Sequence, residues 1–350
     1  MPGSFSSNVI LAKALAMYGH CLKPQNYKEL LACHSVSEIA AYLKTRTSYA
    51  TALREINEAT IHRGYLEMLL RRKLFGDYAS LSRYDMTVGS HLSDYLLERG
   101  EIDQIVQCLR LLGAGRPEEF FFSMPPFFSS HTRLNLIGMS KVKTYGQLLE
   151  ELVGTPYRAI LARFTPKTDE SGSLHIPITD IETALYRHLI ETLQAVIART
   201  HGKERQQLTD LCGAMVDAQN VTRILRLKQF FHASPDAIRA QLLPSGGTLS
   251  RRMQEAMIDA DSPDEVVRLF YTTAAGRKIP EDQRRFIHDL DDRASYFTAR
   301  HHIHFSSSPM VVMFSYVILT DIEVDDIINI IEGVRYGMTA EQIRPMLVML

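Results

Sequence analysis

The apolar side chains of this sequence recur at helical spacing along most of its length, and the closing stretch, residues 324–346, shows the pattern clearly. Its apolar positions fall on one stripe and its polar positions lie opposite, as in an amphipathic helix. The stripe consists of Val324, Ile327, Ile328, Ile331 and Val334, and the opposite side of Asp325, Asn329 and Glu332. Gly337 can end the helix in the left-handed backbone conformation, because it has no Cβ. Thr339 and Gln342 have the spacing of a capping box at the start of a second helix. The pattern predicts a helix, a tight turn and a shorter helix.

This helix pattern occurs three times. The stretches EIDQIVQCLRLL from residue 101 and AQNVTRILRLKQFF from residue 218 repeat the stripe that begins at residue 324. A second element, a capping signal followed by a short buried helix, begins at Ser35, Thr144 and Ser262. The third element is a long helix, which appears in INEATIHRGYLEMLL near residue 56, ITDIETALYRHLIETL near 178 and FIHDLDDRASYFTARH near 286. Three kinds of element therefore return in one order.

The repetition predicts an all-α fold of three pseudo-repeated helical domains, formed by residues 1–122, 123–243 and 244–350. Units of this length are small domains rather than solenoid repeats, which have about 20–50 residues. Three such units with short linkers can close into a funnel or ring, which suits a partner on its axis. Strand signals are poor. The segment SGSLHIPIT, residues 171–179, is the one short candidate, and an extended connector explains it equally well.

Charge and cysteine content argue against several classes of protein. The chain has 39 basic and 40 acidic residues, which gives no electrostatic reason to expect nucleic acid or an anionic membrane surface as partner. Its four cysteines form no CxxC pair, so we expect the reduced thiols of a cytoplasmic protein rather than zinc ligands or disulfides. No stretch approaches the ~20 apolar residues of a membrane span, and the N-terminus has no basic segment before its apolar run. We therefore expect a soluble chain without a secretory signal.

Motifs for catalysis and ligand binding are weak. The string Gly113–Pro117 lacks the lysine and the hydroxyl of a phosphate-binding loop, and no GxSxG elbow occurs. His301 and His304, with His302 between them, could share a helix face and bind zinc. No carboxylate or cysteine lies at ligand spacing beside them, which favours an exposed polar turn. The sequence thus predicts no catalytic residue, no metal and no cofactor, and we expect a protein that is not an enzyme.

The polar face of the middle copy of the repeated helix is basic. It carries Asn220, Arg223 and Arg226 at three-residue spacing, with Lys228 nearby. Its counterpart in the third copy is acidic and includes Asp325 and Asp326, and such adjacent carboxylates diverge on a helix and are typical of a solvated face. Two interpretations of the basic face remain open: salt bridges between neighbouring domains, or a patch that faces a partner. The candidate partner-interface residues are Asn220, Arg223, Arg226, Lys228 and Arg335.

The sequence resembles the C/d subunit family of the vacuolar-type and archaeal-type rotary ATPases. The likeness rests on SNVILAKALAMYGHCL at the N-terminus, on DAQNVTRILRLK at residues 217–228 and on the closing IEVDDIINIIEGVRYGMTAEQIRPML, and it spans nearly the whole chain. Two departures concern contacts. Of the polar positions in the family's N-terminal pattern, only Asn8 and Lys13 are matched. Asp325, Asp326 and Asn329 stand where many relatives are more basic.

The resemblance implies a non-catalytic, funnel-shaped adaptor of three helical domains. Such subunits lie on the cytoplasmic face of the membrane proteolipid ring and receive the tip of the central stalk, made of D- and F-type subunits. They serve ATP-driven ion transport or ATP synthesis, whose chemistry resides in other subunits. The alternative is an all-helical protein-interaction scaffold unrelated to rotary ATPases, and a third, weaker hypothesis is a hydrolase with a histidine-bound metal.

Overall fold

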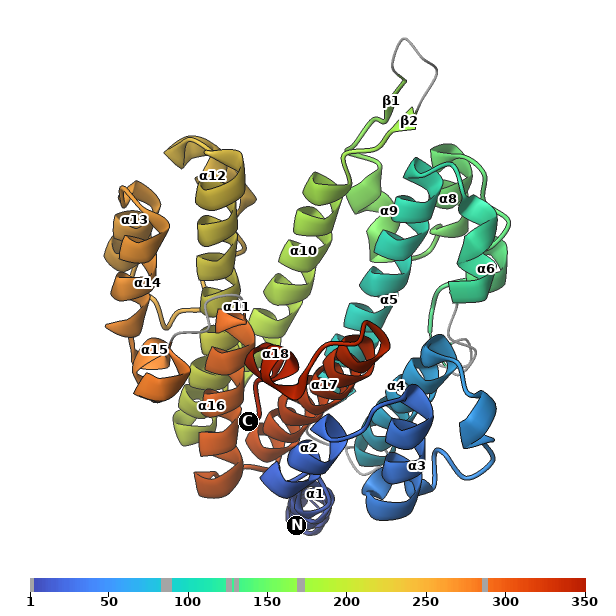
Figure 1. The fold of residues 1–350 in the computed structure, drawn as a ribbon. Helices are drawn as coiled ribbons and strands as arrows, with labels where there is room; N and C mark the ends of the chain where they lie inside the picture. The colour runs from blue at the N-terminus through green and yellow to red at the C-terminus, as the bar shows by residue number, and fades with distance from the viewer. Residues whose placement is uncertain (1–2, 83–89, 124–127, 129–131, 169–173, 285–288) are drawn as a thin grey trace. The chain divides into compact units, whose positions relative to one another are not determined.

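The computed structural model describes residues 3–82, 90–123, 128, 132–168, 174–284 and 289–350 (Figure 1). Most of these residues lie in helices, which confirms the predicted all-α class. The described strands are β1 (Lys167–Thr168) and β2 (Leu174–His175), which form one short antiparallel pair. Strand β2 lies within the segment 171–179, for which the sequence left a strand or an extended connector open, while residues 171–173 lie outside the described part.

The chain divides into two compact units. Unit 1 contains Met1–Ser90, Ile197–Ala240 and Ser245–Leu350, and unit 2 contains His91–Val196 and Gln241–Pro244. The α-helices of unit 1 are α1 (Gly3–Gly19), α2 (Pro24–Leu31), α3 (Val36–Arg46), α4 (Arg63–Ser82), α11 (Gly202–Phe231), α12 (Pro235–Gln241), α13 (Arg251–Asp259), α14 (Pro263–Tyr271), α15 (Ala274–Lys278), α16 (Leu290–Phe305), α17 (Pro309–Arg335) and α18 (Ala340–Ile343). Those of unit 2 are α5 (Ser90–Gly113), α6 (Phe120–Ser123), α7 (Leu136–Met139), α8 (Tyr145–Glu151), α9 (Pro156–Leu161) and α10 (Ile178–Arg199). This division groups residues by proximity and does not test the predicted threefold repeat, which stays a prediction.

The core of unit 1 is built around α17. This helix packs against α1, α4, α11 and α16, and its first half, from Met310 to Thr320, is buried on all sides. A helix that is apolar all round belongs in the interior of a large unit. Among the described residues, we find no helix with both the length and the apolar character needed to cross a membrane.

The predicted helix starts are confirmed at every capping residue named above. Ser35, Thr144 and Ser262 each accept a hydrogen bond from the backbone N–H three residues on. In all three, the side chain at that third position accepts in return from the backbone of the residue before the cap, which is His34, Lys143 or Asp261. The closing capping box of Thr339 and Gln342 is present, and Gly337 has a φ of +70°, as a left-handed stop requires.

The predicted long helices correspond to α4, α10 and α16. Helix α4 begins at Arg63, later than the pattern near residue 56, because Asn57 caps a separate 3-10 turn at Glu58–Thr60. The start of the third pattern, at residues 286–288, lies outside the described residues.

The C-terminal residues fold back onto α16 and α17. Asp326 of α17 accepts from the backbone N–H groups of Val348 at 2.9 Å and Met349 at 3.0 Å, and Arg293 of α16 donates to the carbonyl of Leu347 at 2.8 Å. Asp326 is therefore 1% exposed, and the expectation that both Asp325 and Asp326 lie on a solvated face is wrong for Asp326. The local pattern could not reveal this, because the groups that cover the carboxylate come from the end of the chain.

Gly213 of α11 provides a test of packing in unit 1. A Cβ at this position would collide with the carbonyl oxygen of Gly246, in the loop before α13. Gly213→Ala is therefore expected to lower the free energy of unfolding by about 2 kcal/mol, although alanine favours helix by about 1 kcal/mol. The matched control is Gly76→Ala in α4, where nothing lies within 4 Å of the added Cβ. It should leave stability unchanged or raise it in urea unfolding, and equal effects of the two substitutions would contradict the close approach.

Candidate functional site

Four of the five candidate interface residues lie on α11, and the structure separates them by environment. Asn220 is buried, Arg223 is half-buried, and Lys228 donates to the carbonyl of Ala260 at 2.8 Å. Arg226 is exposed, and we find no ion pair to it within the described residues. Of these four side chains, Arg226 is therefore the most open to a partner.

The fifth candidate, Arg335, is the last residue of a different helix, α17. It is exposed, and its guanidinium donates to the Tyr336 hydroxyl at 2.8 Å and lies 3.5 Å from the Glu332 carboxylate. These contacts all belong to the end of its own helix rather than to α11. The structure thus leaves Arg335 apart from the basic face that the sequence predicted.

Two exposed aromatic residues lie near Arg226 at the C-terminal end of α11. Phe230 and Phe231, in the last turn of the helix, are 64% and 69% exposed. Arg226 and Phe230 are four residues apart and therefore share one helix face. Sequence reasoning did not select the two phenylalanines, although they end the repeated stretch AQNVTRILRLKQFF. We call Arg226, Phe230 and Phe231 the α11 tip.

The three histidines of α16 have different neighbours. The His302 ring lies 2.7 Å from Asp210, which also accepts from Lys278 at 2.7 Å. Although burial opposes ionisation, these two hydrogen bonds lower the pKa of Asp210 to about 2. The other two rings contact aromatic side chains, His301 that of Phe305 and His304 that of Tyr18. Within the described residues, no three potential metal ligands lie together.

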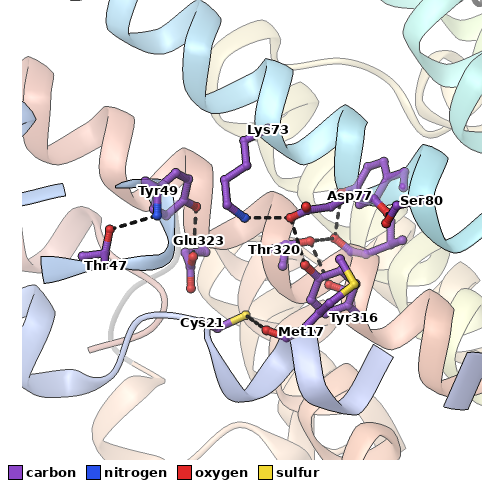
Figure 2. A network of polar contacts seen from close by, with 12 residues as sticks. Met17, Cys21, Thr47, Tyr49, Lys73, Asp77, Ser80, Tyr316, Thr320 and Glu323 are labelled. Carbon is purple, nitrogen blue, oxygen red and sulfur yellow. Dashed lines mark hydrogen bonds and ion pairs between the residues drawn. The ribbon is translucent and has the colours of Figure 1, made fainter. Parts of the chain in front are cut away.

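A buried carboxylate on α17 forms a polar centre that the sequence analysis did not identify. Glu323 is 2% exposed and accepts from the backbone N–H of Leu22 at 2.7 Å. It also accepts from the Tyr49 hydroxyl at 2.9 Å, a contact that Figure 2 shows. Burial raises the pKa of its carboxyl group, and the two donors partly offset that effect. The carboxylate therefore fastens the segment that runs from Leu22 to Tyr49 onto α17.

Glu101 of α5 has the same role in unit 2. It is fully buried and accepts from the backbone N–H of Arg133 at 2.7 Å and from the Tyr157 hydroxyl at 2.6 Å. The guanidinium of Arg133 also donates to it at 2.9 Å. Glu101 thus holds the chain just before α7 and again at α9.

Asp217 of α11 is the third such carboxylate. It is 3% exposed and accepts from the backbone N–H groups of Gly246 at 2.8 Å, Thr248 at 2.9 Å and Leu249 at 2.7 Å. These donors lie just before α13. Asp217 therefore fixes the entry to α13 in the way that Glu323 fixes the entry to α2.

The three carboxylates occupy one position of the predicted repeat. Each lies four residues before a fully buried apolar residue of its stripe, which is Ile105, Val221 or Ile327. Tyr49 and Tyr157, which reach two of the carboxylates, each lie two residues after a threonine at the N-cap position of a short helix. This agreement in geometry supports the prediction of a repeat. The signal was present in the sequence, since an acidic residue precedes each of the three stripes.

A second layer of polar contacts lies beside Glu323, between α4 and α17 (Figure 2). Lys73 donates to Asp77 at 2.7 Å and lies over the Tyr49 ring at 4.9 Å from its centroid. The hydroxyl of Tyr316 donates to the same Asp77 carboxylate at 3.1 Å. Cys21 is buried nearby, and burial raises the pKa of its thiol far above the ordinary value, so this sulfur is a poor nucleophile. The arrangement connects elements of unit 1 to one another.

A cavity of about 750 Å³ borders this layer. Its walls come from the end of α1, the turn of residues 48–56, α4 and α17. Lys73, Asp77 and Glu323 line its inner part, and the side chains of Arg54 and Arg72 line it as well. It is thus a cavity of unit 1 with both polar and apolar walls.

Comparison with known proteins gives one consistent result. The family described as ATP synthase (C/AC39) subunit matches residues 10–346. The C subunit of the A-type ATP synthase from Desulfurococcus sp. (strain SY) is 24% identical over 281 residues, which cover 80% of this chain and 71% of the relative. The protein of the same name from Archaeoglobus fulgidus is 22% identical over 353 residues, which cover 97% of this chain and 96% of the relative. The C subunit from Pyrococcus abyssi is 25% identical over 251 residues, which cover 71% of this chain and 63% of the relative.

Proposed function

The chain belongs to the ATP synthase (C/AC39) subunit family, and from this premise we propose that it is a non-catalytic adaptor of the central rotor in an A/V-type ATPase. In this role it joins the central-stalk subunits of the D and F type to the membrane proteolipid ring, on the cytoplasmic face. The observation that carries the proposal is the extent of the family match, from residue 10 to residue 346. ATP hydrolysis or synthesis and ion translocation then take place in other subunits.

The packing of the described residues suits a part that transmits torque. Such a part must not deform under load, and a close-packed interior has low compressibility. Buried carboxylates add directional bonds, since Glu101, Asp217 and Glu323 each join a long helix to a segment distant in sequence. Hydrogen bonds to charged groups are among the stronger ones in proteins. The three carboxylates would limit the movement of the small helices relative to the long ones.

The α11 tip is the part of the candidate interface that we propose for partner contact, with Arg223 beside it. Its cationic and aromatic side chains are of the kinds enriched where proteins bind one another. Asn220 and Lys228 would support this face from within, because Asn220 is buried and Lys228 bonds to Ala260. Arg335 would contact a partner independently of the α11 tip, at the end of α17.

Binding of the full chain to purified partners tests the proposal. We expect it to bind both a central-stalk complex of D- and F-type subunits and the detergent-solubilised proteolipid ring. Arg226→Glu should weaken one of the two interactions about tenfold, since it reverses a charge at the α11 tip. The control is Arg251→Glu, at an exposed position of α13. Binding to neither partner would overturn the proposed function, and equal binding by the two variants would exclude Arg226 from the interface.

A further inference from the structure

The cavity of unit 1 has two parts with different electrostatic character. In the inner part the charged groups bond within the protein. Lys73 bonds to Asp77, and Glu323 accepts from Tyr49 and from the backbone of Leu22. Lys73 and Asp77 neutralise each other, and Glu323 is held by neutral donors, so these three groups offer no unpaired cation to a ligand.

The outer part carries cations that form no ion pair with any described residue. Arg54 and Arg72 are exposed and line the cavity from the turn after Tyr49 and from α4. In the part of the chain that the structure describes, neither guanidinium makes an ion pair or hydrogen bond. His20, at the end of α1, lines the same cavity and is exposed too. Glu55 is the one exposed carboxylate among the described lining residues, so the outer part has an excess of positive charge.

Neutral groups of two kinds complete the lining. Ser48 and Thr51 bring hydroxyl groups to the wall formed by the turn, and Ile56, Tyr65 and Leu69 bring apolar surface. Guanidinium groups with nearby hydroxyls suit phosphate oxygens, to which arginine can donate two parallel hydrogen bonds. The volume, about 750 Å³, is within the ~300–1,000 Å³ typical of small-molecule sites and much larger than one phosphate ion needs.

We infer that this cavity binds a small organic phosphate, with Arg54 and Arg72 as its charged contacts and the apolar wall against the rest of the ligand. The ligand joins the turn of residues 48–56 to α4, because the two arginines lie on these two elements. Occupancy therefore stabilises the segment that Tyr49 and Glu323 fasten to α17. The same chemistry is offered by a soluble phosphate ester and by a phospholipid headgroup.

The inference is tested by titrating the full chain at low salt with four probes: inorganic phosphate, adenosine monophosphate, glycerol 3-phosphate and a short-chain phosphatidic acid below its micellar concentration. Calorimetry and the melting temperature are the measurements. We expect at least one organic phosphate to bind more tightly than inorganic phosphate and to raise the melting temperature, since a ligand of the folded state stabilises it. Preference for phosphatidic acid identifies a headgroup site, and preference for a soluble ester identifies a metabolite site.

Variants locate the site. Arg72→Ala and Arg54→Ala should each weaken binding about tenfold or more, as expected for loss of a charge-assisted contact to phosphate. Both should fold, because the two side chains are exposed. The matched control is Arg158→Ala in α9, an exposed arginine outside the cavity. No binding of any probe at millimolar concentration, or equal binding by all three variants, would overturn the inference. Either result leaves the rotor adaptor unaffected, since no rotary partner takes part in the titration.

Discussion

Glu323→Ala is expected to lower the free energy of unfolding of unit 1 by about 3–5 kcal/mol. The substitution leaves two buried donors, the Leu22 N–H and the Tyr49 hydroxyl, without an acceptor. Each unsatisfied buried donor costs about 1–3 kcal/mol, and the space left by a side chain that is 2% exposed adds a cavity cost. A domain is stable by about 5–15 kcal/mol in total, so this single carboxylate should account for a large share.

The measurement is urea unfolding of the full chain, together with hydrogen exchange of the Leu22 amide. Tyr49→Phe, which removes one of the two donors, should cost about 1 kcal/mol. Glu55→Ala, at an exposed position, should change stability little and leave the Leu22 amide protected. If Glu323→Ala proves as stable as Glu55→Ala, the carboxylate does not fasten the N-terminal segment to α17.

Asp326→Asn is expected to change how the stability of the protein depends on pH. Burial raises the pKa of Asp326 to about 7, against the lowering effect of the Val348 and Met349 N–H groups and of Arg293. In an unfolded chain an aspartate has a pKa of about 3.9. The folded protein therefore binds this proton more strongly, so the contribution of Asp326 to stability is fully present below pH ~4 and is lost as the pH rises through about 7.

The expected size is about 1.4 kcal/mol per pH unit, or about 4 kcal/mol over the whole window. Asparagine does not ionise, but its NH2 group cannot accept from a backbone N–H as the second carboxylate oxygen does, and this lost bond lowers stability by an amount that does not depend on pH. The stability of the variant, measured relative to that of the natural protein in urea unfolding, should therefore rise between about pH 5 and pH 8. Asp325→Asn, at the exposed neighbour, controls for loss of an acidic residue. A difference between Asp326→Asn and the natural protein that stays constant with pH would contradict the raised pKa.

Helices and their caps could be predicted from the sequence because their determinants are local. A capping residue and its partner are three positions apart, so Ser35, Thr144 and Ser262 could be recognised without a structure. The left-handed residue Gly337 was recognisable for the same reason. The match to residues 10–346 confirms the family that the N-terminal stretch, residues 217–228 and the closing stretch resemble.

The polar centre and the cavity could not be predicted in this way, because distant segments form them. Leu22 and Glu323 are 301 positions apart, and no spacing rule connects them. Asp326 was assigned to a solvated face for the same reason, since the C-terminal residues that cover it lie outside its helix. The sequence places an acidic residue before each stripe. Only the structure gives the groups that donate hydrogen bonds to each of these carboxylates.

We propose that the chain couples the rotor to the membrane ring, and this coupling can be measured as ATP-driven ion transport. The complex is reconstituted into vesicles with and without this subunit, and ion uptake is measured together with ATP hydrolysis. We expect that the vesicles without it hydrolyse ATP but take up no ions, and that adding the purified full chain restores uptake. Equal ion uptake per ATP hydrolysed with and without the chain would show that the chain does not couple the rotor to the ring.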